Sequence, residues 1–101
     1  MDIRIDARED GRFAAFCELN GLRLMAEGQW GNSQVSFASA DDACSPWRSL
    51  VSVDLGEPIS EPIEVGYALA GAIDDWTAPG GAEALDGLRK RSDAYPWTEA
   101  F

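Results

Sequence analysis

Two Asx-Gly pairs, Asp10-Gly11 and Asn20-Gly21, divide the beginning of the chain into three runs in which apolar and polar residues alternate. The runs cover residues 2–8, 12–19 and 22–27. Alternation with a period of two is typical of a strand with one buried face. An Asp-Gly or Asn-Gly pair between two such runs favours a two-residue type I′ hairpin turn. The segment therefore predicts three antiparallel strands in a meander, joined by two type I′ turns.

Two shorter runs continue this pattern. Residues 34–38 place Val35 and Phe37 on one side, and residues 47–55 carry apolar side chains at alternate positions, at Val51, Val53 and Leu55. The residues between the two runs, 39–46, have the Ser, Asp and Pro content of a loop. We therefore expect four to five strands in this half of the chain.

A helical period replaces the alternation after Ser60. Ser60 is the expected N-cap, followed by Pro62 and by acids that suit the positive end of the helix dipole. Apolar residues at helical spacing predict one buried face, formed by Val65, Leu69, Ala72, Ile73 and Trp76. A weaker second helix is expected over 82–91, with inward side chains at Ala84, Leu85 and Leu88.

Together these elements predict an α+β fold. It consists of an antiparallel β-meander of four to five strands, followed by one main helix and a shorter C-terminal helix packed on one face. The length is that of one domain. We expect a single domain over 1–101, with the sheet in 1–55, the helical segment in 60–91 and an aromatic tail in 92–101.

The absence of histidine removes many catalytic arrangements. Cys17 is expected on the apolar face of a strand and Cys44 in an acidic loop, and no histidine is present to activate either thiol. We therefore predict no catalytic residues and no enzymatic activity. The alternative of a small enzyme with paired carboxylates would need a pocket that holds two acids with strongly raised pKa values.

Metal and cofactor motifs are also missing from the sequence. The two cysteines have no metal-site spacing, and no D-x-D-x-D-G calcium loop or glycine-rich phosphate loop occurs. We expect no metal and no cofactor. The beginning of the chain lacks the apolar segment of a signal peptide, and no apolar run is long enough to cross a bilayer. These features predict a cytoplasmic protein with reduced thiols.

Charge is the strongest indication of function. The chain has 18 acidic and 8 basic residues, a formal net charge of -10. Between Asp41 and Asp86 there are ten acids and one base, Arg48, which predicts one acidic face. Such a face repels phosphates and attracts cationic surfaces. The candidate partner-binding residues are acids and one aromatic residue of the helical segment, with two loop acids as a second patch: Glu57, Glu61, Glu64, Tyr67, Asp74 and Asp75, and then Asp41 and Asp42.

These observations favour a small acidic, non-catalytic inhibitor that occupies a basic, nucleic-acid-binding surface of a partner protein. Immunity proteins and antitoxins of nuclease toxins, and phage proteins that block nucleic-acid-binding defence machinery, would use this physics. An alternative is a self-associating structural or accessory module, in which an edge strand and the aromatic tail pack against another copy. The protein would then be a homodimer and not a monomer. A third interpretation is that the acidity serves only solubility or reflects a salty habitat.

Overall fold

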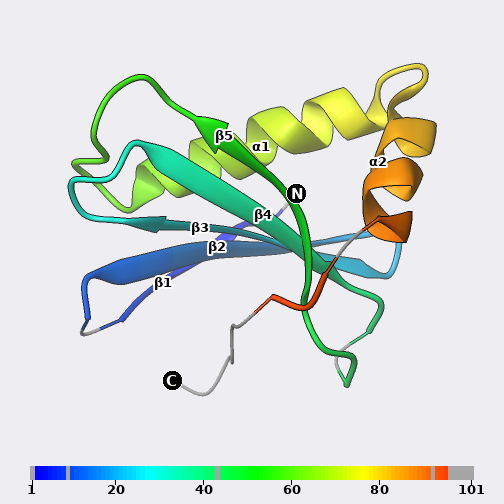
Figure 1. Cartoon of the computed structure of the whole chain (residues 1–101), viewed down its shortest axis with the longest axis horizontal. Helices are drawn as coiled ribbons and strands as arrows, with labels where there is room; N and C mark the ends of the chain where they lie inside the picture. Colours follow the sequence, from blue (N-terminus) through cyan, green and yellow to red (C-terminus); the bar gives the residue numbers. More distant parts are fainter. Residues whose placement is uncertain (1, 9, 43, 92, 96–101) are drawn as a thin grey trace.

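The structure is a computed structural model and describes residues 2–8, 10–42, 44–91 and 93–95. Five antiparallel strands form one sheet in sequence order, and two helices pack on it (Figure 1). This confirms the predicted α+β meander with a main helix and a shorter C-terminal helix. The elements are β1 (Arg4–Ala7), β2 (Arg12–Leu19), β3 (Leu22–Gln29), β4 (Gln34–Ala40), β5 (Arg48–Asp54), α1 (Ile63–Thr77) and α2 (Gly81–Lys90).

The turn between β2 and β3 has the predicted type I′ form. Asn20 and Gly21 have φ angles of 52° and 85°, and positive φ at both central positions defines this turn. The turn sets the register in which Leu19 pairs with Leu22. The pairing then continues along the full length of both strands, each of eight residues.

The turn between β1 and β2 is longer than predicted. Within the Asp10-Gly11 pair only Gly11 has a positive φ, 85°. Arg8 N–H donates to the carbonyl oxygen of Arg12 at 2.7 Å, so three residues lie between the two ends of the turn. The Asp10 carboxylate accepts a hydrogen bond from Arg12 N–H at 3.1 Å, an Asx contact that favours the longer loop. The prediction of a type I′ turn is therefore wrong at this position.

β4 extends two residues beyond the predicted run, to Ala40. Ser39 and Ala40 are buried and pair with Leu24 and Arg23 of β3. Pairing with this long neighbouring strand outweighs the loop-like composition, so the loop begins only at residue 41. Between Phe37 and Ala38 the register of β4 with β5 shifts, which is a β-bulge near the sheet edge.

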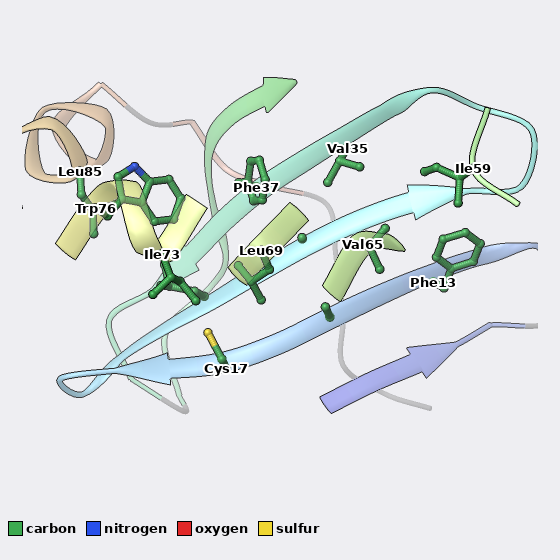
Figure 2. Close-up of a cluster of buried hydrophobic side chains, with 13 residues drawn as sticks. Phe13, Cys17, Val35, Phe37, Ile59, Val65, Leu69, Ile73, Trp76 and Leu85 are labelled. Carbon is green, nitrogen blue, oxygen red and sulfur yellow. The ribbon is translucent and has the colours of Figure 1, made fainter. Parts of the chain in front are cut away.

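The main core lies between the sheet and α1 (Figure 2). Val65, Leu69, Ile73 and Trp76 are buried, as the helical period predicts, and Ala72 is half-buried at the margin. The ring of Trp76 meets that of Phe37 edge to face, with 5.9 Å between the centroids. The buried strand residues occupy alternate positions, so the two periodicities of the sequence meet in one core: Phe13, Ala15, Cys17, Leu24, Ala26, Val35 and Phe37.

α2 lies against the end of α1 and against β5. It begins at Gly81, one residue before the predicted start, and ends at Lys90. Leu85 is buried and Leu88 packs partly against the core, but Ala84 is exposed. The prediction that Ala84 points inward is wrong, because this short helix contacts its neighbours along a narrow face.

A second, smaller core covers the face of the sheet that is turned away from the helices. The alternation along the strands, which indicates one buried face, gave no sign of it. Residues 93–95 reach this face by pairing with the start of β5: Ser49 N–H donates to the Asp93 carbonyl at 2.7 Å, and Tyr95 N–H to the Trp47 carbonyl at 3.0 Å. The tail therefore docks on its own sheet as far as Tyr95, whereas Trp97 and Phe101 lie outside the described residues. The buried members are Ala14, Phe16, Met25, Ala38, Ala40 and Trp47.

Both helices are short and carry exposed charged residues. α1 has 15 residues and α2 has 10. Within the described ranges, neither combines the length and the apolarity that crossing a membrane requires.

Candidate partner-binding surface

The candidate residues of the helical segment lie in one layer of the molecule but form two groups. Glu57 and Glu61 are exposed before α1, and Asp74 and Asp75 are exposed near its end. The ten helical steps from position 64 to position 74 span about 15 Å. Tyr67 lies between the groups on α1 and is 68% exposed. These side chains thus lie in one layer of the molecule, but they do not form a single cluster.

Glu64 has a structural role, because its carboxylate caps the start of α1. Its Oε2 atom accepts hydrogen bonds from the N–H groups of Ser60 at 2.7 Å and Glu61 at 2.8 Å. The predicted Ser60 cap is wrong: α1 begins at Ile63, and the Glu64 side chain reaches back to the preceding turn. Pro62 has no N–H to donate, and the Glu64 carboxylate accepts instead from the N–H groups of the two residues before it. The bond from Glu61, followed by that from Ser60, lowers the pKa of Glu64.

Replacing Glu64 with glutamine should make the stability of the protein less dependent on acid pH. A carboxyl group with a lowered pKa in the folded state contributes stability above its ordinary pKa of 4.5, and this stability is lost as the pH falls through the lowered value. Between about pH 5 and about pH 3 the wild type should therefore lose more unfolding free energy than Glu64→Gln, as measured by urea denaturation. Glu57→Gln is the matched control, because Glu57 is exposed and accepts no hydrogen bond from the described residues. An equal loss in Glu64→Gln and the wild type would contradict the assignment.

Asp41 and Asp42, the second candidate patch, are occupied by contacts within the molecule. Asp41 lies 2.6 Å from the Arg89 guanidinium, so its charge is neutralised. Asp42 accepts hydrogen bonds from Cys44 N–H at 2.8 Å and from the Ser45 hydroxyl at 2.9 Å. The Cys44 bond is the main cause of a lowered pKa of Asp42. Asp41 and Asp42 therefore stabilise the loop between β4 and β5.

Five acids of the helical layer have no ion pair within the described part of the chain. Residues 49–88 contain eight acids and neither lysine nor arginine. Arg89 and Lys90, the next bases along the chain, pair with Asp41 and Asp86. The absence of bases is the signal that could have added Glu83 of α2 to the predicted residues. We call these five acids the acidic helical surface: Glu57, Glu61, Asp74, Asp75 and Glu83.

Most arginines lie with the sheet, and the second core holds two of them. The Arg4 guanidinium stands 4.8 Å from the centroid of the Phe16 ring, and the Arg23 guanidinium stands 4.8 Å from that of Trp47. Cation–π contacts of this kind fix a guanidinium over an aromatic face. Guanidinium groups therefore lie on the sheet face opposite the helices, where Arg4 also pairs with Asp6 at 3.0 Å, and the acidic helical surface lies on the other side.

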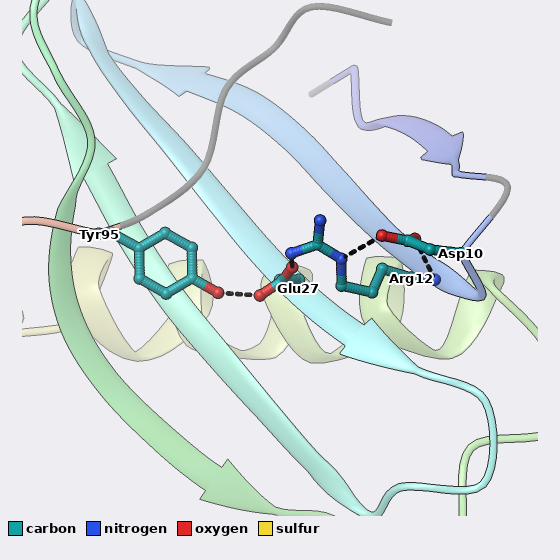
Figure 3. A network of polar contacts seen from close by, with 4 residues as sticks. All are labelled: Asp10, Arg12, Glu27 and Tyr95. Atoms are coloured by element: carbon teal, nitrogen blue, oxygen red, sulfur yellow. Dashed lines mark hydrogen bonds and ion pairs between the residues drawn. The ribbon is translucent and has the colours of Figure 1, made fainter.

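A polar network on the same sheet face fixes the C-terminal segment (Figure 3). The Tyr95 hydroxyl donates to Oε1 of Glu27, and Oε2 of Glu27 lies 3.4 Å from Arg12. Arg12 also pairs with Asp10 at 2.9 Å. Burial, and then the Glu27 carboxylate, raises the pKa of Tyr95, so the hydroxyl remains a donor at neutral pH. The sequence offered no local signal for this network, because 68 positions separate Tyr95 from Glu27.

Tyr95→Phe should destabilise the protein by about 1–2 kcal/mol. The substitution keeps the ring in the second core but leaves the Glu27 carboxylate, whose side chain is 15% exposed, without its hydroxyl donor. The unfolding free energy from urea titration measures the loss. Tyr67→Phe is the control and should change stability by less than about 0.5 kcal/mol, because its hydroxyl is at the surface. Unchanged stability of Tyr95→Phe would show that the network does not hold the tail.

Carboxylate catalysis would need a pocket that holds two acids with raised pKa values. A hollow of about 590 Å³ beside the two helices has Asp86 and Arg89 as its charged lining residues. Burial raises the pKa of the Cys17 thiol to about 11. Among the described residues, no group of three or more His, Cys, Asp or Glu side chains could hold a metal ion. Within the described ranges, four carboxyl groups have shifted pKa values. All four are lowered, mainly by backbone N–H donors, which is opposite to the shift of a general acid: Asp10, Asp42, Asp54 and Glu64.

Comparison of the chain with known protein families, with curated proteins and with solved structures gives no match.

Proposed function

We propose that this protein is a non-catalytic inhibitor that binds a basic surface of another protein through the acidic helical surface. The supporting observation is a difference in charge pairing between the two sides of the fold. Arginines of the sheet pair with acids, Arg4 with Asp6 and Arg12 with Asp10 and Glu27, whereas five acids of the helical layer have no ion pair among the described residues. A field of one sign on one side attracts a cationic partner in a defined orientation and accelerates the encounter.

The partner surface in this proposal is one that nucleic acids normally occupy. Carboxylates carry the same sign of charge as phosphates, so a groove lined with Lys and Arg attracts both. Immunity proteins or antitoxins of nuclease toxins, and phage proteins that block defence machinery, are the functional classes that fit. We propose a cytoplasmic location, to which the two unbonded cysteines, buried Cys17 and exposed Cys44, are suited.

Displacement of nucleic acid tests this function. A panel of purified cationic nuclease domains is loaded with a fluorescent oligonucleotide in chelator, and the protein is added at rising salt. We expect the protein to release the oligonucleotide from at least one domain, and the release to weaken between about 50 mM and about 300 mM salt as charges are screened. Release from no domain, or release that does not depend on salt, would contradict the proposal.

One observation favours self-association as a second candidate function. Val51 and Val53 of β5, and Leu55 just after it, are 37–38% exposed. Exposed apolar side chains that lie together can pack against another copy of the chain. Sedimentation at several concentrations distinguishes the two functions. A dimer that Val53→Lys dissociates would favour the accessory module, and a monomer at all concentrations would remove this candidate.

A further inference from the structure

The opposite edge of the sheet has an apolar groove of about 300 Å³ between β1 and α1. Two of its residues on α1, Ile63 and Tyr67, are 44% and 68% exposed. Large apolar side chains that gather in a concave surface mark binding sites more often than scattered ones do. The lining consists of Ile3, Ile5, Ile63, Gly66, Tyr67 and Ala70.

Gly66 gives this groove its shape. A Cβ atom at this position would lie 3.1 Å from Cδ1 of Ile5 and 3.8 Å from Cγ2 of Ile3. A glycine within a helix costs about 1 kcal/mol relative to alanine. Here it lets Ile5 of β1, and Ile3 just before β1, approach the helix backbone closely.

The backbone of β1 is open along this groove. Arg8 N–H donates to Arg12 of β2, and in an antiparallel ladder successive residues direct their backbone groups to opposite sides. Ile5 and Ala7 therefore direct their N–H and C=O groups away from β2. β1 is the first strand of the sheet order, and within the described residues no backbone hydrogen bond beyond β2 reaches it.

The other edge strand, β5, is better protected. Residues 93–95 pair with its beginning, and the bulge opposite Phe37 and Ala38 interrupts its register. Bulges and covering segments are the usual means by which proteins block strand addition at an edge. Of the two edges, β1 is therefore the one that offers both open backbone groups and an adjoining pocket.

Charge indicates what occupies this edge. Glu61 precedes Ile63 at one end of the groove, and Asp74 follows Ala70 by one turn on the same flank of α1. Neither has an ion pair in the described part of the chain. The helical steps from Ile63 to Asp74 span about 16 Å, the length of about five residues in a strand. A bound strand of this length would place its two ends near these carboxylates.

We infer that the β1 edge binds an extended segment of the partner protein by strand addition, with apolar side chains in the groove and a basic residue at each end. The segment adds a sixth strand to the sheet, and alternate side chains enter the pocket beside Tyr67. This inference rests on the proposed function, because it names the part of a cationic partner that the helical layer recognises.

Backbone-modified peptides test strand addition. The probe is the capped heptapeptide Lys-Ser-Val-Ser-Val-Ser-Lys, added to the isotope-labelled protein up to about 5 mM, which detects even millimolar affinity by NMR. We expect shifts at Ile5, Ala7 and Tyr67. One variant is N-methylated on its valines and another on its serines. Because only one set of N–H groups faces β1, one variant should bind at least tenfold more weakly and the other like the probe. Equal binding of both variants, or no binding of the probe, would overturn the inference.

Protein variants and a charge-reversed peptide complete the test. The peptide with glutamate at both ends should bind at least tenfold more weakly, and Tyr67→Ala should weaken binding of the probe, whereas Val53→Ala on β5 should not. Amide protection of Ile5 and Ala7 that rises with protein concentration alone would assign the edge to a second copy and overturn the inference. Nucleic-acid displacement without peptide binding would leave the proposed function standing alone. Peptide binding without displacement of nucleic acid would support strand addition at β1 and contradict the proposed function.

Discussion

Replacing Gly81 with alanine should destabilise the fold by about 3 kcal/mol. Gly81 is buried at the start of α2, and a Cβ atom there would lie 2.2 Å from the carbonyl oxygen of Asp75 and 2.6 Å from backbone atoms of Trp76. Backbone atoms within a helix cannot rotate away as the end of a side chain can. α2 would therefore move away from α1, and Leu85 would lose contacts in the core.

The matched control is Gly71→Ala. Gly71 is exposed within α1, and a Cβ atom there has no neighbour within 4 Å. Alanine at this position should stabilise the protein by up to about 1 kcal/mol through helix propensity alone. Urea unfolding of both variants measures the contrast. A Gly81→Ala protein as stable as the wild type would show that α2 is not packed against the end of α1 as described.

Leu69→Ala should cost about 3–5 kcal/mol of unfolding free energy. Leu69 is fully buried at the centre of the face of α1 that packs on the sheet (Figure 2). Alanine is the strongest helix former, so the loss measures removed packing and the cavity that remains, and not a weaker helix.

Tyr67→Ala provides the comparison on the same helix. The Tyr67 side chain is 68% exposed, and its removal should change the unfolding free energy by less than about 0.5 kcal/mol. Thermal or urea denaturation of the two variants determines which face of α1 is buried. Equal effects at the two positions would contradict the packing of α1, and a stable Tyr67→Ala protein validates its use with the peptide probe.

Local patterns predicted the elements of the fold well, because each depends on residues close in sequence. The helical period identified Val65, Leu69 and Ile73 as core residues, and Asn20-Gly21 identified a type I′ turn. The same reasoning failed at Asp10-Gly11, where the side chain of Asp10 binds Arg12 N–H and favours a longer loop.

Contacts between distant residues could not be predicted in this way. The second core forms where Trp47 and Tyr95 pack on the sheet, and the Tyr95 hydroxyl donates to Glu27, 68 positions away. Alternation along β2 indicated one buried face, yet Phe16 on the other face is buried as well. No spacing within a strand indicates that a tail will cover its second face.

For the candidate surface, too, local sequence patterns were informative and contacts between distant residues could not be predicted. The ten acids and one base between Asp41 and Asp86 predicted one acidic face. The sequence could not reveal that Arg89 neutralises Asp41, because 48 positions separate the two residues. The Glu64 cap, by contrast, had a local signal in the four-residue spacing from Ser60. The groove beside Gly66 depends on the approach of β1 to α1 and had no such signal.

Matched charge variants test most directly whether the acidic helical surface captures a cationic partner. Asp74→Asn with Asp75→Asn removes two charges from this surface, and Glu18→Gln with Asp93→Asn removes two exposed charges elsewhere. Both pairs reduce the net charge of -10 by the same amount. Binding to a cationic nuclease domain that releases its oligonucleotide is then measured at about 50 mM and about 300 mM salt. We predict that the first pair weakens binding about tenfold at low salt and little at high salt, and that the second pair binds within about twofold of the wild type. Equal binding by the two double variants at low salt would contradict capture by this surface.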